Sequence, residues 1–298
     1  LKGQGPLGLA KTLFSLFRSV FVCLGILLKR RPDLIFSAGG YAGAPFLVLG
    51  SLLGVRCEIL EQNRMPGLAN RWMAKFCRKV YVNFAASKDL FPGKEVAVVG
   101  HPCRPEIEKA RWPLAERTAR AQANPFKIFV FGGSQGAIGI NRLLTAASSE
   151  LKNLDLDILH QTGEADFERV QADYAKAGFQ RVRVEKFIYE MAAAFQESHL
   201  VICRAGASSL AELAAAGKAA LLIPLVSKDR HQEFNATEME VIGASISKLQ
   251  GSLNGEILAA TVKELYTDRQ KILSLAEKIS TLHQPEAAQK IATAILKG

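Results

Sequence analysis

The sequence predicts an α/β protein with two doubly wound domains, and three observations lead to this fold class. Short apolar runs without polar alternation recur along the chain, as in parallel strands that are covered on both faces. Segments with helical periodicity separate these runs. The chain has 298 residues, of which 49% are hydrophobic, so it is long enough for two ordinary domains, and disordered and fibrous classes are excluded.

The first domain is expected over residues 1–104. An apolar helix over 7–28 opens it, and a strand at 34–36 runs into Gly39-Gly40. A helix that starts at Pro45, a strand over 55–60, a helix over 67–78 and strands at 80–84 and 96–99 follow. Judged by its strands, this domain is truncated at its N-terminus. The proline-rich stretch 105–125 is expected to be an interdomain linker.

The second domain is expected over residues 126–282. The apolar runs predict strands at 126–131, 157–160, 182–187, 200–203, 220–225 and 244–248. Helices fill the gaps, among them 140–151, 165–177, 210–216 and 234–242. This alternation describes a complete doubly wound domain. Residues 283–298 are expected to form a C-terminal helix placed to pack back on the first domain.

The positive charge of the chain is concentrated in its first part. The whole sequence has 38 Lys and Arg against 28 Asp and Glu, a net charge of +10. Residues 1–123 carry 19 basic and 8 acidic side chains, whereas residues 124–298 carry 19 and 20. The first part is therefore expected to meet an anionic surface. It has no recognisable nucleic-acid-binding module, so a nucleic-acid partner is not expected.

The helix expected over residues 7–28 is the most apolar segment of the protein. Lys11 and Arg18 interrupt it, which disfavours a helix that spans a membrane. Burial on a sheet, with solvated basic ends, is a second interpretation. We favour a helix that lies in the interface of an anionic bilayer, because no acidic residue precedes Asp33 and apolar side chains cover more than one face. The expected membrane contacts are Lys11, Leu13, Phe14, Phe17, Arg18 and Phe21.

The cysteines and histidines exclude several kinds of chemistry. Five cysteines are scattered without a C-x-x-C spacing, which argues against a disulfide framework and a zinc site and favours a reducing cytosol. The sequence has no H-E-x-x-H motif, no nucleophile elbow and no recognisable triad. Asp155-Leu156-Asp157 resembles a metal-binding D-x-D, but it stands where a strand starts, and we expect no metal site there.

A glycine-rich turn predicts a phosphate site. The strand over 126–131 runs directly into Gly132-Gly133-Ser134-Gln135-Gly136-Ala137 and then into a helix. Such a turn presents backbone N–H groups and the positive end of a helix dipole, and Ser134 adds a hydroxyl donor. The spacing is neither G-x-G-x-x-G nor that of a P-loop, and the next strand ends in His160-Gln161. A nicotinamide dehydrogenase and P-loop chemistry are therefore disfavoured.

A second strand end predicts a ribose site beside the phosphate site. Residues 203–209 read Cys-Arg-Ala-Gly-Ala-Ser-Ser and lead into a helix that carries Glu212 in its second turn. Small side chains let a ligand approach the backbone, and Glu212 can accept hydrogen bonds from a vicinal diol, although a surface acid is an equally good reading. Gln232 and Asn235, after the loop that starts at Pro224, could hold sugar hydroxyls. Arg104 could meet phosphate. A nucleotide across the carboxyl ends of the strands is the expected ligand.

Taken together, the motifs resemble the MurG family, the UDP-N-acetylglucosamine–lipid I N-acetylglucosaminyltransferases of bacterial peptidoglycan synthesis. They follow one another in family order over nearly the whole chain: Ala38-Gly39-Gly40-Tyr41, Glu61-Gln62-Asn63, Pro66 to Asn70, Val99 to Pro102 with Arg104, Gly132 to Ala137, Cys203 to Gly217, and Lys228 to Asn235. The resemblance implies a glycosyltransferase B fold, in which two Rossmann-like domains face a cleft. It also implies a peripheral protein on the cytoplasmic side of the inner membrane.

The resemblance assigns roles to individual residues. The implied ligands of UDP-N-acetylglucosamine are Asn63, Arg104, Ser134, Ile188 through its backbone, Ala207, Ser208, Ser209, Leu210, Glu212, Gln232 and Asn235, with Gly132, Gly133, Gln135 and Gly136 in the phosphate loop. The lipid-linked acceptor would face Gly39, Gly40 and Tyr41. No tightly bound cofactor is implied, and a divalent cation is an optional aid.

The sequence departs from the family pattern at three places. The family begins with a strand and a G-G-T-G-G-H loop whose His is the usual candidate for the general base, and no such loop is present here. His101 stands where Asn is common, and His231 stands where Gln is common. No catalytic residue is therefore assigned.

The favoured function is an inverting transfer of N-acetylglucosamine from UDP-N-acetylglucosamine to lipid I, which forms lipid II. Two alternatives remain at this point. One is a truncated, non-catalytic subunit that binds the UDP-sugar and docks on the membrane. The other is a UDP-sugar epimerase, for which the sequence shows no acid/base pair.

Overall fold

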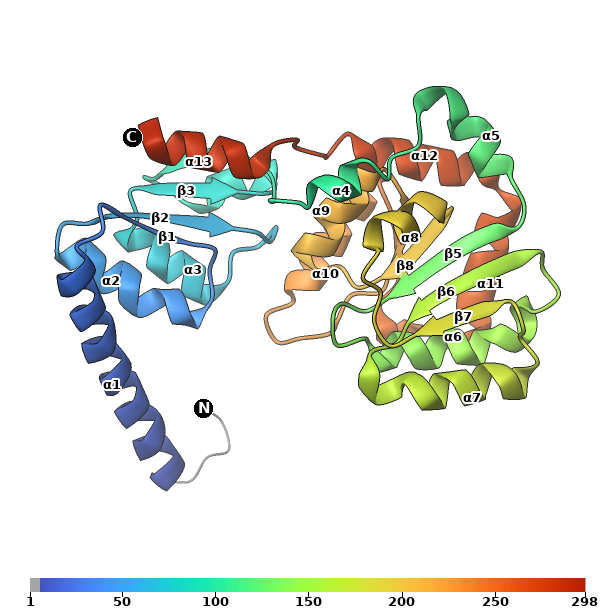
Figure 1. Cartoon of the computed structure of the whole chain (residues 1–298), viewed down its shortest axis with the longest axis horizontal. Helices are drawn as coiled ribbons and strands as arrows, with labels where there is room; N and C mark the ends of the chain where they lie inside the picture. The colour runs from blue at the N-terminus through green and yellow to red at the C-terminus, as the bar shows by residue number, and fades with distance from the viewer. Residues whose placement is uncertain (1–5, 298) are drawn as a thin grey trace. The chain divides into compact units, whose positions relative to one another are not determined.

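The computed structural model of the chain describes residues 6–297, and the side chains among them from residue 18 onward except that of Tyr41. The membrane contacts predicted at Lys11, Leu13, Phe14 and Phe17 and the acceptor contact predicted at Tyr41 fall on side chains outside this description. The chain divides into two compact units, Leu1–Val99 and Gly100–Gly298. Each contains a parallel sheet with helices, which confirms the predicted fold class (Figure 1).

The first unit is a parallel sheet with the strand order β1-β2-β3-β4. Its elements are α1 (Pro6–Arg30), β1 (Leu34–Ser37), η1 (Tyr41–Gly43), α2 (Ala44–Leu52), β2 (Arg56–Glu61), α3 (Leu68–Met73), η2 (Ala74–Phe76), β3 (Lys79–Val82), η3 (Ala85–Leu90) and β4 (Glu95–Val98). The helices α2 and α3 cover one face of the sheet, where Leu47 and Met73 pack on Ile59 and Val80. The helix α1 packs along α2 and buries Cys23 and Leu27.

The second unit is a parallel sheet with the strand order β10-β9-β8-β5-β6-β7. Its strands are β5 (Phe126–Phe131), β6 (Leu156–Gln161), β7 (Val182–Glu185), β8 (Leu200–Cys203), β9 (Ala219–Leu222) and β10 (Ile246–Ser247). Its longer helices are α6 (Ile138–Leu151), α7 (Phe167–Ala177), α8 (Met191–Glu197), α9 (Ala207–Ala216), α10 (His231–Val241), α11 (Gly255–Thr267), α12 (Arg269–Ser280) and α13 (Ala287–Lys297), with η5 (Glu164–Asp166) and η6 (Gln250–Ser252) between them.

The strand order of the second unit reverses between β5 and β8. From β5 the chain builds outward through β6 and β7, and it then returns to the other side of β5 to lay down β8, β9 and β10. Phe131 pairs with both Gln161 and Cys203, so these three strands end at the same level. A doubly wound sheet opens a crevice at such a switch point, because the helices that follow the two adjacent strands cover opposite faces.

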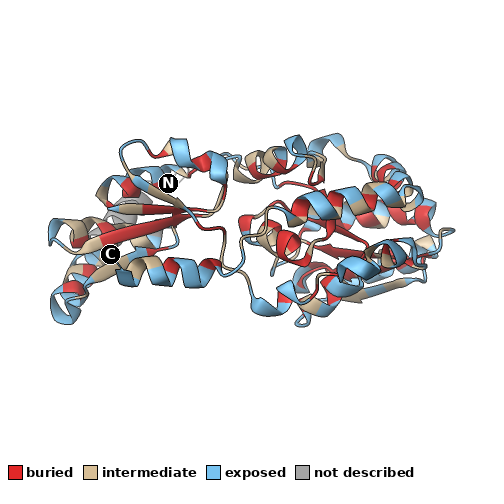
Figure 2. Cartoon of the chain, turned by 90° about the horizontal axis from the view of Figure 1, so that it is seen from above, coloured by how far each residue is buried: buried red, intermediate tan, exposed pale blue. Residues whose placement is uncertain are grey.

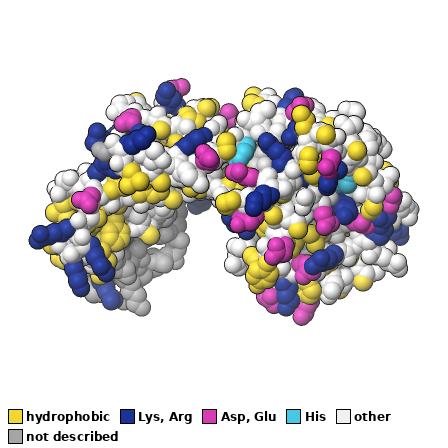
Figure 3. All heavy atoms as spheres, turned by 45° about the horizontal axis from the view of Figure 1, so that its top comes forward, with side chains coloured by type: hydrophobic (Ala, Val, Ile, Leu, Met, Phe, Trp, Pro, Cys, Tyr) yellow, Lys and Arg dark blue, Asp and Glu magenta, His cyan; other side chains and the backbone are white. Residues whose placement is uncertain are grey.

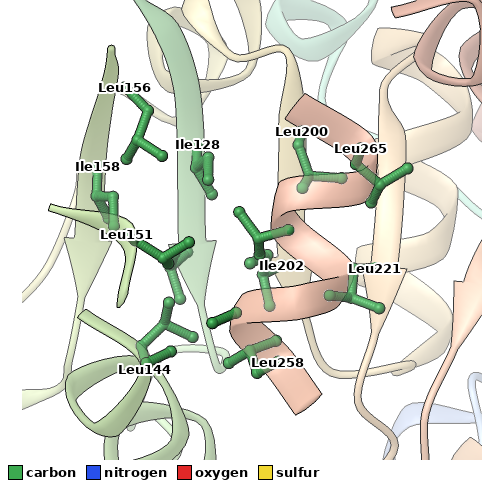
Figure 4. Close-up of a cluster of buried hydrophobic side chains, with 14 of the residues drawn as sticks. Ile128, Leu144, Leu151, Leu156, Ile158, Leu200, Ile202, Leu221, Leu258 and Leu265 are labelled. Carbon is green, nitrogen blue, oxygen red and sulfur yellow. The ribbon is translucent and has the colours of Figure 1, made fainter. Parts of the chain in front are cut away.

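The core of the second unit has two layers of apolar side chains. On one face, residues of β5, β6, β8 and β9 pack against α6, α7, α11 and α12 (Figure 4). On the other face, the ring centroid of Phe195 in α8 lies 5.5 and 5.9 Å from those of Phe129 and Phe131. Figure 2 shows the buried residues concentrated in the strands and on the inner sides of the helices. Strands covered on both faces explain the continuous apolar runs of the sequence.

The stretch 105–125 differs from the expected linker. It forms α4 (Pro105–Glu108), η4 (Leu114–Glu116) and α5 (Arg117–Gln122), and it belongs to the second unit. Pro105 stands in the first turn of α4, where the missing N–H of proline costs little. Trp112 donates from Nε1 to the carbonyl of Gln196 at 2.6 Å, and the Nζ of Lys218 lies 3.7 Å from its ring centroid. These contacts fasten the stretch to the body of the second unit.

Candidate functional site

The glycine turn between β5 and α6 forms the first wall of the site. Gly133 and Gly136 have φ of +95° and +74°, and the amide of Gly136 donates to the carbonyl of Gly133 at 2.9 Å. A Cβ on Gly136 would lie 1.8 Å from the carbonyl oxygen of Thr162, so the turn is packed backbone to backbone against the end of β6. Ser134 and Gln135 are exposed at its tip. Glycine is needed here both for its conformation and for its size.

The start of α9 forms the second wall, one strand away. Gly206 precedes α9 as Ala137 precedes α6, and neither residue has a side chain that could accept from the first helical N–H groups. Ala207 and Leu210 are buried, whereas Ser208 is exposed and Ser209 half-buried. Two uncapped helix N-termini therefore flank the switch point between β5 and β8, and both favour an anionic ligand.

Two side chains of α9 already have partners. The carboxylate of Glu212 accepts from Nη2 of Arg104 at 2.8 Å. The hydroxyl of Ser208 lies 3.2 Å from Nε2 of His101. The structure thus brings Arg104, Ser208 and Glu212 together, as the sequence predicted for the nucleotide site, and adds His101 to them.

A side-chain amide links the glycine turn to Ile188. Gln161 is buried at the end of β6, donates from Nε2 to the carbonyl of Gly133 at 2.9 Å and accepts from the amide of Ile188 at 3.1 Å. The N–H of Ile188, for which a backbone contact with uracil is predicted, is therefore engaged within the protein. Gln161 was noted in the sequence only for not being acidic. Its position at the end of an apolar strand was the available signal for this role.

A buried polar network lies beneath the glycine turn. His160 contacts the hydroxyl of Tyr174 at 3.0 Å and Oδ1 of Asn141 at 3.1 Å, and Asn141 donates to Thr162 and Asp166. Burial lowers the pKa of His160 to about 3, so the ring is neutral near pH 7. His160 supports the turn from below, and because it is buried with both ring nitrogens hydrogen-bonded, it is not placed to act as a general base.

The helix α10 carries both predicted sugar ligands, Gln232 and Asn235, and they have different surroundings. Oε1 of Gln232 accepts from the amide of Leu225 at 2.9 Å. The NH₂ group of Gln232 therefore points away from that amide. Asn235 has no exposed surface and donates to the carbonyl of Ala205 at 3.0 Å. Asn235 therefore supports the chain before α9, and the expectation that it contacts sugar hydroxyls does not fit its position. The sequence could not distinguish the two, because both lie near the start of the same helix.

Arg204 is a residue of the site that the sequence left without a role. Its guanidinium is buried and donates to the carbonyls of Ile223 and Pro224 and to Oε1 of Gln250, at 2.9, 3.3 and 2.7 Å. It ties the end of β8 to the loop after β9. Burial lowers the pKa of Arg204, but the three acceptors satisfy its charge.

The first unit carries a separate cluster at the ends of β1 and β2. The buried carboxylate of Glu61 accepts from the amide and Nδ2 of Asn63 at 2.8 and 3.3 Å and from Nδ2 of Asn70 at 2.8 Å. Gly39 and Gly40 have positive φ, and a Cβ on Gly39 would lie 2.9 Å from Nδ2 of Asn70. The predicted ligands Gly39 and Asn63 thus lie in the loops after β1 and β2, and Asn70 lies against Gly39 and bonds to Glu61, the partner of Asn63.

The thiols and acidic pairs offer no other reaction centre among the described residues. Burial raises the pKa of Cys203 far above its usual range and that of Cys103 to about 11, so neither is an activated nucleophile. Asp155 and Asp157 both pair with Arg181. Within residues 6–297, no group of three His, Cys, Asp or Glu side chains is placed to hold a metal ion.

Comparison with known proteins places the two units in one family. Residues 1–82 match the glycosyltransferase family 28 N-terminal domain, and residues 127–292 match the glycosyltransferase family 28 C-terminal domain. A UDP-N-acetylglucosamine–N-acetylmuramyl-(pentapeptide) pyrophosphoryl-undecaprenol N-acetylglucosamine transferase of Myxococcus xanthus is 39% identical over 98% of this chain and 76% of its own length. The enzyme of the same name from Haemophilus ducreyi is 37% identical over 100% of this chain and 82% of its own.

Solved structures show the same relationship. The crystal structure of Acinetobacter baumannii MurG matches with a TM-score of 0.82 and 31% identity, over 96% of this chain and 79% of that one. A UDP-GlcNAc 2-epimerase from Neisseria meningitidis matches with a TM-score of 0.68 at 12% identity, over 94% of this chain and 80% of that one, which shows a shared fold alone.

The fold and the site define a glycosyltransferase with the glycosyltransferase B fold. The switch-point crevice with two open helix N-termini is where such a fold binds its ligand. The chain belongs to the MurG family.

Proposed function

We propose that this protein transfers N-acetylglucosamine from UDP-N-acetylglucosamine to lipid I and so forms lipid II. The observation that carries the proposal is the pair of uncapped helix N-termini at the β5/β8 switch point, with Ser134 at one and Glu212 at the other. Their spacing along the sheet suits a nucleoside diphosphate, with the diphosphate at the glycine turn and the ribose at α9. The enzyme names of the relatives support the same substrates.

The chemistry follows from these positions. The acceptor hydroxyl attacks the anomeric carbon on the face opposite the diphosphate while its proton passes to a general base. The bond from that carbon to the diphosphate breaks, and the electron pair leaves with UDP, so the configuration inverts. The N–H groups of α6 and the hydroxyl of Ser134 stabilise the charge that develops on the diphosphate.

The donor assignment is tested by binding and by transfer. UDP-N-acetylglucosamine affinity is measured by calorimetry for wild type, Ser134→Ala and Glu212→Ala, with Glu256→Ala on α11 as the matched control. Loss of a hydrogen bond to a charged group predicts roughly ten- to hundredfold weaker binding for the first two variants. Unchanged affinity in both would remove the donor site. Transfer of labelled sugar to a lipid I analogue tests the reaction, and a 2-epimer released without acceptor would indicate an epimerase.

We further propose that the first unit docks on an anionic membrane through α1. Phe21, Val22 and Leu28 are 56%, 52% and 56% exposed on this helix, and Leu52 at the end of α2 is 74% exposed. Lys29, Arg30 and Arg31 follow directly. Figure 3 shows hydrophobic side chains bordered by Lys and Arg on this unit. Such a combination suits an interfacial helix on the cytoplasmic side of the inner membrane. Among the described residues, no helix has the length and apolar character needed to cross a membrane.

A further inference from the structure

Two residues near the start of the second unit contact side chains of α9. His101 meets Ser208 at 3.2 Å, and Arg104 meets Glu212 at 2.8 Å. Ser208 and Glu212 are four residues apart, so they lie on one face of α9, and residues 101–104 run along that face. In the proposed function, both α9 side chains belong to the donor site. The protein therefore satisfies these groups with its own side chains before any donor arrives.

Arg104 and a ribose compete for Glu212. A vicinal diol bound to a carboxylate in the bidentate arrangement donates to both oxygens, and the guanidinium already takes up part of the accepting capacity of Oε1. The side chain of Arg104 is 53% exposed and that of Glu212 17% exposed. An ion pair with one exposed partner is weak and is broken at small cost.

We propose that Arg104 exchanges partners when the donor binds, from Glu212 in the free protein to the donor diphosphate in the complex. This inference rests on the proposed function. The ribose removes the carboxylate from Arg104, and the same ligand delivers phosphate oxygens that are separated from the ribose ring by one methylene group. A guanidinium prefers such bidentate oxyanions, so rotation of its own side chain gives it a new partner. Arg104 is then a positioning residue that opposes a nucleoside and favours a nucleoside diphosphate.

His101 keeps the backbone of this stretch in place during the exchange. Its Nδ1 lies 2.7 Å from the carbonyl of Pro102, and a carbonyl oxygen only accepts, so Nδ1 carries the proton. Nε2 is then the acceptor for the hydroxyl of Ser208. Residues 101–104 stay on α9 through this bond while the Arg104 side chain turns.

The exchange predicts opposite effects of one substitution on two ligands. Affinities of uridine, 2′,3′-dideoxyuridine and UDP are measured by ligand-detected NMR and calorimetry for wild type and Arg104→Ala. Uridine should bind up to about fivefold more tightly to Arg104→Ala, because the competing ion pair is gone. UDP should bind roughly ten- to hundredfold more weakly, because a charge-assisted contact is lost. Dideoxyuridine, which lacks the diol, should bind both proteins equally.

Salt dependence gives an independent readout. Salt screens an exposed ion pair, so wild-type affinity for uridine should rise with salt toward that of Arg104→Ala, whose own affinity should not change. Arg183→Ala is the matched control, because Arg183 is an exposed arginine paired with Glu185 at 2.8 Å in the same unit. It should leave all three affinities unchanged, and thermal unfolding shows whether either variant is misfolded.

The outcomes separate this inference from the proposed function. Uridine affinity that is unchanged or weaker in Arg104→Ala would overturn the competition for Glu212. UDP affinity that is unchanged in Arg104→Ala would overturn the move to the diphosphate. If wild type does not bind UDP, or if Glu212→Ala binds it as wild type does, the donor site itself is wrong and the proposed function fails first.

Discussion

Side chains at the site either support the backbone or lie exposed at helix N-termini, and the two groups differ in burial. Gln161, Arg204 and Asn235 are buried and hydrogen-bonded to backbone carbonyls or amides, so they hold strand ends and turns in place. Ser134 and Ser208 are exposed at helix N-termini. Sequence reasoning found the second kind, because an exposed hydroxyl after a glycine turn is a local pattern. It missed Gln161 and Arg204 because their partners come from distant segments.

Two buried histidines make the second unit sensitive to acid. Burial lowers the pKa of His160 to about 3 and that of His199 to about 4, while an unfolded chain takes up these protons near pH 6.5. The unfolded state therefore binds more protons as pH falls below that value, and the folded state loses stability. For His160 the loss is about 1.4 kcal/mol per pH unit.

Urea unfolding at pH 7.5 and 5.5 measures this effect. The midpoint should fall at the lower pH, and His160→Gln, whose amide can still contact Tyr174 and Asn141, should show a smaller fall than wild type. Burial also lowers the pKa of His283, which acts in the same direction. Equal midpoints at the two pH values would contradict the neutral state of the buried rings.

At the scale of elements, the strands were the most predictable part of the structure. The runs 126–131 and 200–203 match β5 and β8 to the residue, because strands covered on both faces are nearly continuous in apolar residues, with Lys127 as the exception in β5. The stretch 105–125 was misjudged because its prolines suggested a linker. Pro105 instead starts α4, and Pro113 directly precedes η4. Proline marks a helix start as readily as a loop, and only the packing against α8 and α9 decides between them.

The glycine turn provides a matched pair of substitutions. Gly133 and Gly136 both have positive φ, but a Cβ on Gly133 would meet nothing within 4 Å, whereas one on Gly136 would collide with the backbone of Thr162. Gly133→Ala should cost about 1–2 kcal/mol for conformation alone. Gly136→Ala should cost clearly more, since backbone must move as well. The unfolding free energies of the two variants, compared in urea, measure the difference, and equal losses would mean that the turn is not packed against β6.

The helix α1 makes the membrane proposal testable with single substitutions. Phe21→Glu should weaken binding to phosphatidylglycerol vesicles by roughly ten- to hundredfold, because burial of a phenylalanine side chain contributes about 1.5–3 kcal/mol. Val241→Glu on α10 is the control, since Val241 is 79% exposed on the other unit. Flotation measures both variants. Wild-type binding that ignores salt and anionic lipid would contradict the electrostatic part of the docking.

At the scale of the whole molecule, each unit carries its own tryptophan. The sequence has two tryptophans, Trp72 in α3 and Trp112 in the second unit. Trp72 is 49% exposed and lies 5.0 Å from the ring of Phe76, whereas Trp112 is 8% exposed. Trp72→Phe and Trp112→Phe therefore give two proteins whose fluorescence reports one unit each.

These reporters locate the ligand by its effect on stability. The contacts proposed for the diphosphate and the ribose, at Ser134 and Glu212, belong to the second unit, so UDP should raise the unfolding midpoint that Trp112 reports. At a ligand concentration of 100 times Kd the gain is about 2.7 kcal/mol. The transition reported by Trp72 should not move with UDP. A shift of the Trp72 transition alone would place the nucleotide on the wrong unit.

The positive charge of the chain is also unevenly distributed, and this is visible in the sequence alone. The excess of basic residues lies before residue 124, and in the structure part of it follows the exposed apolar side chains of α1. What the sequence could not show is which of these apolar residues face outward. The pattern of Cys23 and Leu27 buried against α2, with Phe21 and Val22 exposed, depends on the packing of α1.

The side-chain amide of Gln161 links the glycine turn to Ile188. This link determines whether the conformational entropy of the two segments is lost during folding or on ligand binding. The turn and the segment around Ile188 are ordered once, during folding, so a nucleotide that touches both immobilises neither. Fragments of that nucleotide should accordingly bind with little heat-capacity change from protein ordering. The arrangement of these two segments, which contributes to selectivity for the donor, is therefore already formed in the free enzyme.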